Sequence, residues 1–321
     1  MCSAALYPAD RPESVTILPS VPGLGSLYGK ALVPSGAAVR EAVGKVLPLG
    51  VFGDSNPTVK AETLSLPDVT YAARGVRFDA ELLARYQSLF SLPHTDEVPA
   101  GFTQVTAFPV AMALMVAPEF PLPLMGMVHL SNRVEVARTI RADEECEVFA
   151  WAQNLAGHAK GTSVELVVEV QITGSVVWRG TSTYLAKGKY LRGRGVDPIE
   201  RAEFVPGFPT AQWNLGAGVG RDYAAISGDR NPIHMSALSA KAFGFPRAIA
   251  HGMYTAARAL AEARGLHGES YVWDVDFAKP VLLPSKVAVA IHRLDGETVE
   301  FTGWNGKSSK LHFSGAIKPL T

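Results

Sequence analysis

The segment YAAISGDRNPIH ends at His234 and carries Asp229 five residues before it, so a carboxylate and an imidazole stand close together in sequence. The composition around them predicts a loop with specific turn chemistry, because three turn-forming residues accompany the pair: Gly228, Asn231 and Pro232. Gly228 lets the backbone turn, Pro232 stiffens the return, and Asn231 is suited to bond across the loop and hold the acid. If the loop folds back, Asp229 and His234 can share one water and perform acid and base steps on it.

A third candidate, His251, starts the segment HGM, which also contains Gly252 and Met253. His251 is suited either to line a pocket or to hydrogen-bond the loop that carries Asp229. Asp229, His234 and His251 could in principle bind a metal, but their spacing fits no familiar metal motif. We therefore expect neither a metal nor another cofactor.

Strand patterns surround this motif in both halves of the chain. The second half contains KVAVAIHRL, TVEFTGW and SKLHFSGAI, with the turn pairs Asp295-Gly296 and Asn305-Gly306 between them. Residues 271–318 are thus predicted to form an antiparallel meander. The first half contains CEVFAWAQN, SVELVVEVQIT and SVVWRGTSTYL, with a turn at Thr173-Gly174.

Each strand group follows a small-residue or apolar helix, predicted at Phe108–Ala117 and at Ala250–Gly265. The similar order of elements suggests an internal duplication into two α+β units, each an antiparallel sheet wrapped around a central helix. We expect residues 1–190 to hold a lead-in and the first unit, and residues 204–321 the second. Residues 1–70 are predicted to be irregular apart from a first strand, and the basic segment 187–203 to be the linker.

The motif S-G-D-x-N-P-[IL]-H, its continuation MSALSAKAFGFPRAIAHGM and the strand VDFAKPVLLP together resemble the MaoC-like, R-specific enoyl-CoA hydratase (hydratase 2) family of hot-dog folds. The motif resemblance covers residues 223–260, and two units with a motif in only one are similar to the double hot-dog members. The resemblance implies that Asp229 and His234 catalyse reversible hydration of 2-enoyl thioesters to (3R)-3-hydroxyacyl thioesters. It also implies that the Gly252 N–H is an oxyanion donor and that the substrate is an acyl-CoA or acyl carrier protein thioester.

Other residues are candidates for binding the substrate: His251 and Met253 beside the dyad, and Arg247 and Arg258 flanking the helix. The phosphates of a thioester arm could instead be bound by the basic segment that contains Lys187, Lys189, Arg192 and Arg194. Two rival functions stay open, a non-catalytic acyl-thioester-binding protein and a hot-dog thioesterase.

A second Gly-Asp-x-Asn-Pro occurs in FGDSNPTV, but Val59 replaces the histidine, and we interpret this segment as a turn. In the first unit, the region YQSLFSLPHTDEVPAGF offers only His94 and Asp96 and lacks the motif. The first unit is therefore predicted to be a degenerate copy. We expect the two units to pair within the chain, with a homodimer also possible.

The composition of the chain bears on its ligand class, its cellular compartment and whether it spans a membrane. The 321 residues have a formal net charge of +0, which argues against a nucleic-acid ligand. The two cysteines, Cys2 and Cys146, favour a reducing compartment. The absence of a signal-like N-terminus agrees with this, so we expect a cytoplasmic protein. Residues 105–128 are long and apolar enough to span a bilayer, but they contain four prolines and a glutamate, so we expect a buried helix there instead.

Overall fold

A computed structural model describes residues 6–32, 64–191, 203–294 and 297–321 of the chain. Within these ranges, eleven strands form one sheet in the order β1-β2-β6-β7-β8-β4-β10-β13-β12-β11-β9. Its strands from the first half of the chain are β1 (Val15–Ile17), β2 (Thr70–Val76), β4 (Met127–Val136), β6 (Cys146–His158), β7 (Gly161–Ile172) and β8 (Ser175–Lys187). Those from the second half are β9 (Ala211–Leu215), β10 (Tyr271–Phe277), β11 (Ser285–Arg293), β12 (Val299–Asn305) and β13 (Leu311–Pro319). A separate small pair is formed by β3 (Glu97–Val98) and β5 (Ile140–Arg141).

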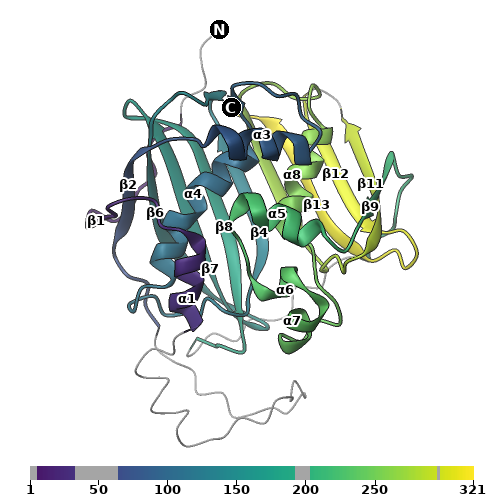
Figure 1. The fold of residues 1–321 in the computed structure, drawn as a ribbon, viewed down its shortest axis with the longest axis horizontal. Helices are drawn as coiled ribbons and strands as arrows, with labels where there is room; N and C mark the ends of the chain where they lie inside the picture. The colour runs from purple at the N-terminus through teal and green to yellow at the C-terminus, as the bar shows by residue number, and fades with distance from the viewer. Residues whose placement is uncertain (1–5, 33–63, 192–202, 295–296) are drawn as a thin grey trace, which may run out of the picture.

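Two helices lie against the sheet, and both are seen in front of it in Figure 1. Helix α4 (Ala100–Met115) packs on β2, β6, β7 and β8, whereas α8 (Gly252–Glu262) contacts β13. The other helices are α1 (Leu24–Leu32), α3 (Ala80–Leu89), α5 (Val219–Ser227), α6 (Pro232–Met235) and α7 (Ala237–Ala242). Helix α4 is apolar on all sides and is buried along most of its length, as expected for a helix inside a fold.

The two halves of the sheet meet where β4 pairs with β10 in antiparallel fashion, from Ser131 opposite Asp276 to Val136 opposite Tyr271. This pairing places side chains of the first half next to elements of the second half. It matters for the candidate site, because β4 and β8 carry His129 and Tyr184, which lie near Asp229.

The predicted helix at Phe108–Ala117 has the wrong start. Helix α4 begins at Ala100, and Pro109 lies inside it rather than at its first turn. The first turns contain Gly101, Thr103 and Gln104, whose residue types do not predict an apolar helix. All three are nevertheless buried. Tertiary burial therefore extends the helix beyond what local propensity suggests.

The strand prediction for the second half is correct in position but wrong in order. β11, β12 and β13 form a meander, but β10 pairs with β13 and β4 instead of β11. After β10, the chain crosses to the far side of this half, where β11 pairs with β9. β10 is thus left in the middle of the sheet.

The turn predictions have mixed outcomes. Thr173 and Gly174 join β7 to β8 with φ angles of 48° and 79°, as a two-residue hairpin turn requires. The connection after Asn305 is longer than the predicted pair, and the Asn305 side chain accepts hydrogen bonds from the N–H groups of Lys307 and Ser308. Asp295-Gly296, FGDSNPTV, Cys2 and most of the predicted linker lie outside the described residues.

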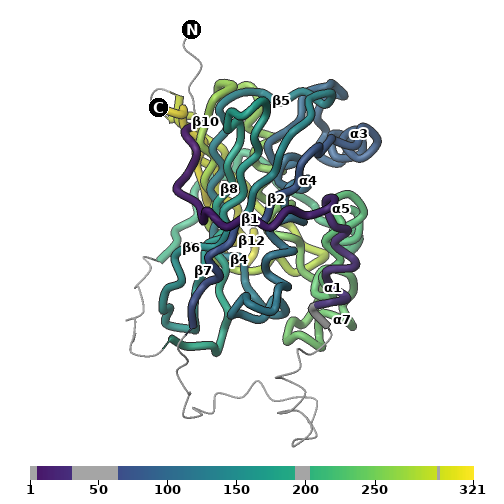
Figure 2. The backbone as a smooth tube through the Cα atoms, turned by 90° about the vertical axis from the view of Figure 1, so that its left-hand side faces the viewer, coloured from purple at the N-terminus to yellow at the C-terminus, as the bar shows by residue number. Residues whose placement is uncertain are grey.

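The N-terminal lead-in contains a helix that was not predicted. β1 pairs in parallel with β2, and α1 then packs against α4, where Leu24 and Leu27 bury themselves beside Met112. Figure 2 shows this segment passing from the edge of the sheet to α1. The prediction of an irregular lead-in is therefore wrong for residues 24–32.

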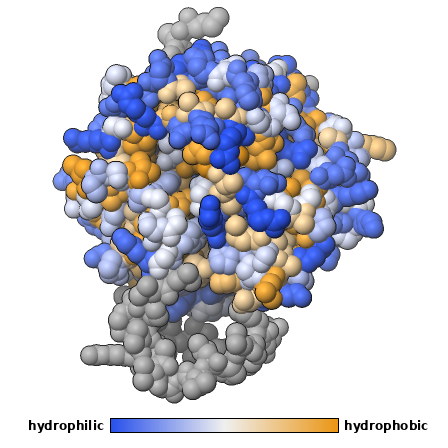
Figure 3. All heavy atoms as spheres, in the orientation of Figure 1, coloured by the Kyte–Doolittle hydropathy of each residue, from blue (hydrophilic) through white to orange (hydrophobic). Residues whose placement is uncertain are grey.

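None of the described helices is long and apolar enough to cross a bilayer. The apolar sequence around residues 105–128 instead contributes to α4, which lies within the fold. Figure 3 shows that polar residues cover much of the outer surface on this side, with smaller apolar areas between them.

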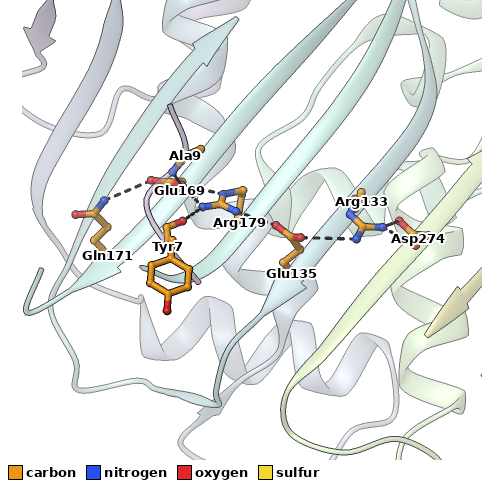
Figure 4. A network of polar contacts seen from close by, with 8 residues as sticks. All are labelled: Tyr7, Ala9, Arg133, Glu135, Glu169, Gln171, Arg179 and Asp274. Carbon is orange, nitrogen blue, oxygen red and sulfur yellow. Dashed lines mark hydrogen bonds and ion pairs between the residues drawn. The ribbon is translucent and has the colours of Figure 1, made fainter. Parts of the chain in front are cut away.

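A row of charged side chains crosses one face of the sheet, from β7 to β10 (Figure 4). Glu169 is fully buried and lies 2.7 Å from the Arg179 guanidinium, which also reaches Glu135 at 3.1 Å. Glu169 also accepts a hydrogen bond from the Ala9 N–H, at 2.9 Å. The bond from Ala9 to Glu169 therefore holds the N-terminal segment, which leads on to α1, against this face of the sheet.

We predict that Glu169→Gln lowers the free energy of unfolding by about 3 kcal/mol, because it removes the buried carboxylate that pairs with Arg179 and leaves this partly buried guanidinium with Glu135 as its remaining carboxylate partner. Urea unfolding measures the change. Glu147→Gln is the matched control on the neighbouring strand, since its pair with Arg74 is solvent-exposed and should contribute less than about 1 kcal/mol. Equal, small losses in both variants would contradict a structural role for the buried charge.

Candidate active site

The sequence motif is divided between two helices and the turn that joins them. Gly228 ends α5 in the left-handed conformation, with φ 73°, and its N–H donates to the Ala224 carbonyl at 2.9 Å. Asn231 then caps α6, and Pro232 occupies its first position. The predicted loop is thus limited to the turn around Asp229, while His234 lies on the short helix.

His234 is buried, and the hydrogen bond it makes fixes which nitrogen is protonated. Its Nδ1 lies 2.8 Å from the Ile249 carbonyl oxygen, which can only accept, so Nδ1 carries the proton. Nε2 is therefore left with a lone pair. Burial, followed by the neighbouring His251, lowers the pKa of His234 to about 3, and the ring is neutral at physiological pH.

Asp229 is surrounded by groups that favour its ionised form. Its Oδ1 accepts hydrogen bonds from the Tyr28 hydroxyl and from the Asn231 N–H, the latter at 3.1 Å. Burial alone would raise the pKa of Asp229, but His251, His234 and the two hydrogen bonds outweigh it, and the pKa lies below its ordinary value. The carboxylate is thus ionised next to a neutral imidazole.

Asn231 holds the acid through its backbone. The Asn231 side chain accepts from the Ile233 N–H at 3.4 Å and so caps α6, while its backbone N–H binds the carboxylate. The expected bond from Asn231 to the acid is therefore present, and it comes from the backbone N–H rather than from the side chain.

His251 packs directly on His234, with ring centroids 3.6 Å apart and planes 25° apart. Its Nε2 donates to the Asp229 carbonyl at 3.0 Å and lies 3.7 Å from Oδ2 of the same residue. Of the two interpretations left open by the sequence, the structure favours the hydrogen bond to the loop that carries Asp229.

Gly252 begins α8, whose cap residue His251 makes no side-chain capping bond. Among the described residues, the Gly252 N–H has no hydrogen-bond partner. A Cβ at this position would lie 3.0 Å from the Phe277 ring, so a larger residue would crowd that ring. The helix start therefore presents a free N–H beside the two histidines.

Other residues near Asp229 come from elements far away in sequence, and none of them was predicted from the sequence. His129 of β4 stacks on Tyr184 of β8 at 4.5 Å and lies 5.0 Å from Phe277 of β10. Burial lowers the pKa of His129 to about 4, so this ring is also neutral. Tyr28 reaches Asp229 from α1, across 201 positions in the chain, and no local pattern distinguishes it.

The two predicted arginines do not contact the dyad. Arg247 is exposed and donates to the Pro284 carbonyl at 3.2 Å. Arg258 lies over the Trp213 ring at 4.7 Å and pairs with Glu262 at 3.1 Å. Met253 is half-buried at the start of α8, next to Gly252. Substrate binding by these three residues stays a prediction.

The first half has no counterpart of the dyad at His94 and Asp96. His94 bonds to the exposed Ser88, and Asp96 pairs with Arg141 at 2.8 Å. Lys187 ends β8, whereas Arg192 and Arg194 lie outside the described residues. Cys146 is buried and its pKa is raised to about 12, chiefly by burial, so it is an unreactive thiol.

Asp229, His234 and His251 place one potential ligand atom each within 4.8 Å of one another, so their spacing alone would permit a metal ion. Each histidine, however, already uses one ring nitrogen to donate to a backbone carbonyl. The remaining groups, a lone-pair nitrogen and a carboxylate, are equally suited to hold a water and move its protons.

The chain is similar to a known family model, to a curated relative and to several solved structures. Residues 219–313 match the MaoC like domain. The chain is 33% identical over 248 residues to 3-hydroxyacyl-thioester dehydratase X of Mycobacterium tuberculosis, covering 77% of this chain and 86% of that protein. The crystal structure of HtdX from the same organism superimposes with a TM-score of 0.70 at 30% identity, over 78% of this chain and all of that one. A MaoC-like dehydratase from Phytophthora capsici, at 18% identity, shares the fold with a TM-score of 0.61 over 78% of this chain and 95% of that one. The predicted α+β hot-dog fold is confirmed.

We predict that Tyr28→Phe raises the pKa of Asp229, because it removes a hydrogen bond to the carboxylate while keeping the ring that packs there. A carbon-13 NMR titration of the carboxyl resonance measures this pKa directly. Tyr7→Phe is the control, since Tyr7 is 82% exposed. An unchanged pKa in Tyr28→Phe would contradict the role assigned to the hydroxyl.

Proposed function

We propose that this chain, which belongs to the MaoC-like dehydratase family, catalyses the reversible addition of water to 2-enoyl thioesters to give (3R)-3-hydroxyacyl thioesters. The observation that carries the proposal is the pairing of an ionised Asp229 with a neutral His234 whose Nε2 keeps its lone pair. A water between these groups can donate one hydrogen bond to each of them.

In the hydration direction, Nε2 of His234 takes a proton from the water as the water oxygen attacks C3 of the substrate. The electron pair of the C2=C3 bond moves toward the thioester, and negative charge develops on its oxygen. The protonated imidazole then returns the proton to C2, so that the net change is the addition of one water. Asp229 orients the water and stabilises the positive charge that His234 carries in between.

The thioester oxygen needs a hydrogen-bond donor as it becomes negative. The free N–H of Gly252 at the start of α8 is suited to this role, since the helix dipole also favours negative charge there. One such donor typically contributes a few kcal/mol to lowering the barrier. Gly252 is therefore proposed as the oxyanion donor, beside the acid–base pair.

The first half is proposed to complete the site rather than to catalyse. The β4–β10 pairing supports this, because His129 of β4 and Tyr184 of β8 lie near enough to Asp229 to interact with it electrostatically. The same pairing supports the proposal that units at residues 1–190 and 204–321 associate within one chain. The acyl carrier, coenzyme A or acyl carrier protein, would approach the side of the dyad that faces solvent, where 25% of the Asp229 side chain is exposed.

We predict that Asp229→Asn and His234→Gln each reduce kcat for crotonyl-CoA hydration by at least about a hundredfold, the scale of lost acid–base catalysis. A spectrophotometric assay of the enoyl absorbance measures this loss, and circular dichroism checks the fold.

Asp96→Asn and His94→Gln are matched controls, with the same residue types on the surface of the first half, and both should retain full activity. Treatment with EDTA should leave the rate unchanged, because the proposed steps need no metal. Near wild-type turnover in either dyad variant would reject the assignment of the dyad, and absence of turnover in the wild type would favour a binding protein.

We also predict that the product has the R configuration at C3. The assay couples hydration to R-specific and S-specific 3-hydroxyacyl-CoA dehydrogenases, and only the R-specific enzyme should generate NADH. A predominantly S product would contradict the stereochemical part of the proposal while leaving hydration itself in place.

A further inference from the structure

A cavity of about 290 Å³ lies at the N-terminal end of α4, away from Asp229 and His234. Its lining includes Pro99 and Ala100 at the start of α4, Leu260 and Ala261 on the second half of α8, and Tyr271 at the start of β10. The cavity thus lies between the two halves, beside the end of α8 that is opposite Gly252. Its volume is at the lower end of the range for small-molecule sites.

Two tyrosines in the cavity lining have hydroxyl groups without protein partners. Tyr86 is 2% exposed and Tyr271 is 8% exposed, and neither hydroxyl makes a hydrogen bond to another described residue. Burial, the main cause in both cases, raises the pKa of each phenol, so both groups stay protonated and can donate. Because both residues line the cavity and neither hydroxyl has a protein acceptor, each is free to donate a hydrogen bond to a ligand or a water there.

A third donor and the helix end add to this set. Trp178 also lines the cavity, is fully buried, and its indole N–H has no hydrogen-bond partner. Helix α4 begins without a side-chain cap, and no described residue accepts a hydrogen bond from the N–H groups of Ala100 and Gly101. The Tyr86 hydroxyl lies against Gly101, where any side chain would collide with it. These hydroxyl, indole and backbone N–H groups can all donate hydrogen bonds at this end of the cavity.

The rest of the lining is largely apolar, with charged residues at intervals. Leu92, Val98 and Val136 contribute aliphatic surface. Arg264 also lines the cavity and is exposed. Glu97, another lining residue, lies 3.6 Å from Arg141 and is thus partly neutralised. A ligand that matches this lining has acceptor oxygens at one end and a short apolar chain.

We propose that this cavity is a second, non-catalytic binding site for a short or medium acyl chain that ends in a carboxylate or a thioester carbonyl. The oxygens bind to the donors of Tyr86, Tyr271 and the start of α4, and the chain lies along the apolar wall. Because the site shares no residue with the dyad, it goes beyond the proposed hydration reaction and can be tested apart from it.

Isothermal titration calorimetry with octanoate and, separately, octanoyl-CoA tests the proposal. The first variant is Tyr86→Phe combined with Tyr271→Phe, which removes only two hydroxyls. The second is Ala261→Trp, which fills the cavity from a half-buried position. Tyr7→Phe is the control for hydroxyl loss, and Asp229→Asn tests independence from the dyad.

If the ligand is a free acid, one equivalent of octanoate binds to the wild type and to Asp229→Asn alike. Its affinity falls about tenfold in the double phenylalanine variant, and binding is lost in Ala261→Trp. If the ligand is a thioester, octanoyl-CoA instead loses one equivalent in Ala261→Trp. The proposal is overturned if neither ligand loses an equivalent in Ala261→Trp, or if the double variant binds both as tightly as Tyr7→Phe. Crotonyl-CoA hydration by the same variants reports on the dyad separately.

Discussion

The hydrogen bond from His234 Nδ1 to the Ile249 carbonyl is the interaction on which the site depends. It fixes the imidazole tautomer and leaves Nε2 as the acceptor. It also joins the motif to the segment before α8, since the Ile249 N–H in turn donates to the Ile233 carbonyl at 3.0 Å. One segment thereby holds the base and, two residues later, the His251 ring that stacks on it.

The lowered pKa values of His234 and Asp229 make the stability of the folded protein depend on pH. His234 is favoured as the neutral form in the fold, so the stability it contributes is present above its ordinary pKa and is lost as pH falls toward about 3. The pKa of Asp229 is also lowered in the folded state, so its contribution is present above its ordinary pKa and is lost as pH falls through the folded value. Both groups therefore stabilise the folded protein at neutral pH, where Asp229 is ionised and His234 is neutral. This stabilisation is lost in acid.

Local patterns in the sequence were sufficient for some parts of this structure and not for others. Alternating strands, the Thr173-Gly174 turn and the S-G-D-x-N-P-I-H motif are short-range features, so they indicated the fold, the strands and the candidate dyad. Tyr28, His129 and Tyr184 could not be found, because strand pairing and the packing of α1 bring them near Asp229 from distant positions. The start of α4 was missed for a related reason, since burial of Gly101 and Gln104 is decided by tertiary contacts rather than by helix propensity.

The central claim is that Asp229 and His234 act on one shared water, and hydration of crotonyl-CoA in deuterium oxide tests it most directly. If one water supplies both added groups, deuterium at C2 and oxygen at C3 are delivered to the same face of the double bond. Proton NMR coupling between the C2 and C3 hydrogens of the isolated product should then show a single, syn-addition diastereomer. Anti addition, or a mixture of the two diastereomers formed before any exchange, would contradict the shared-water account.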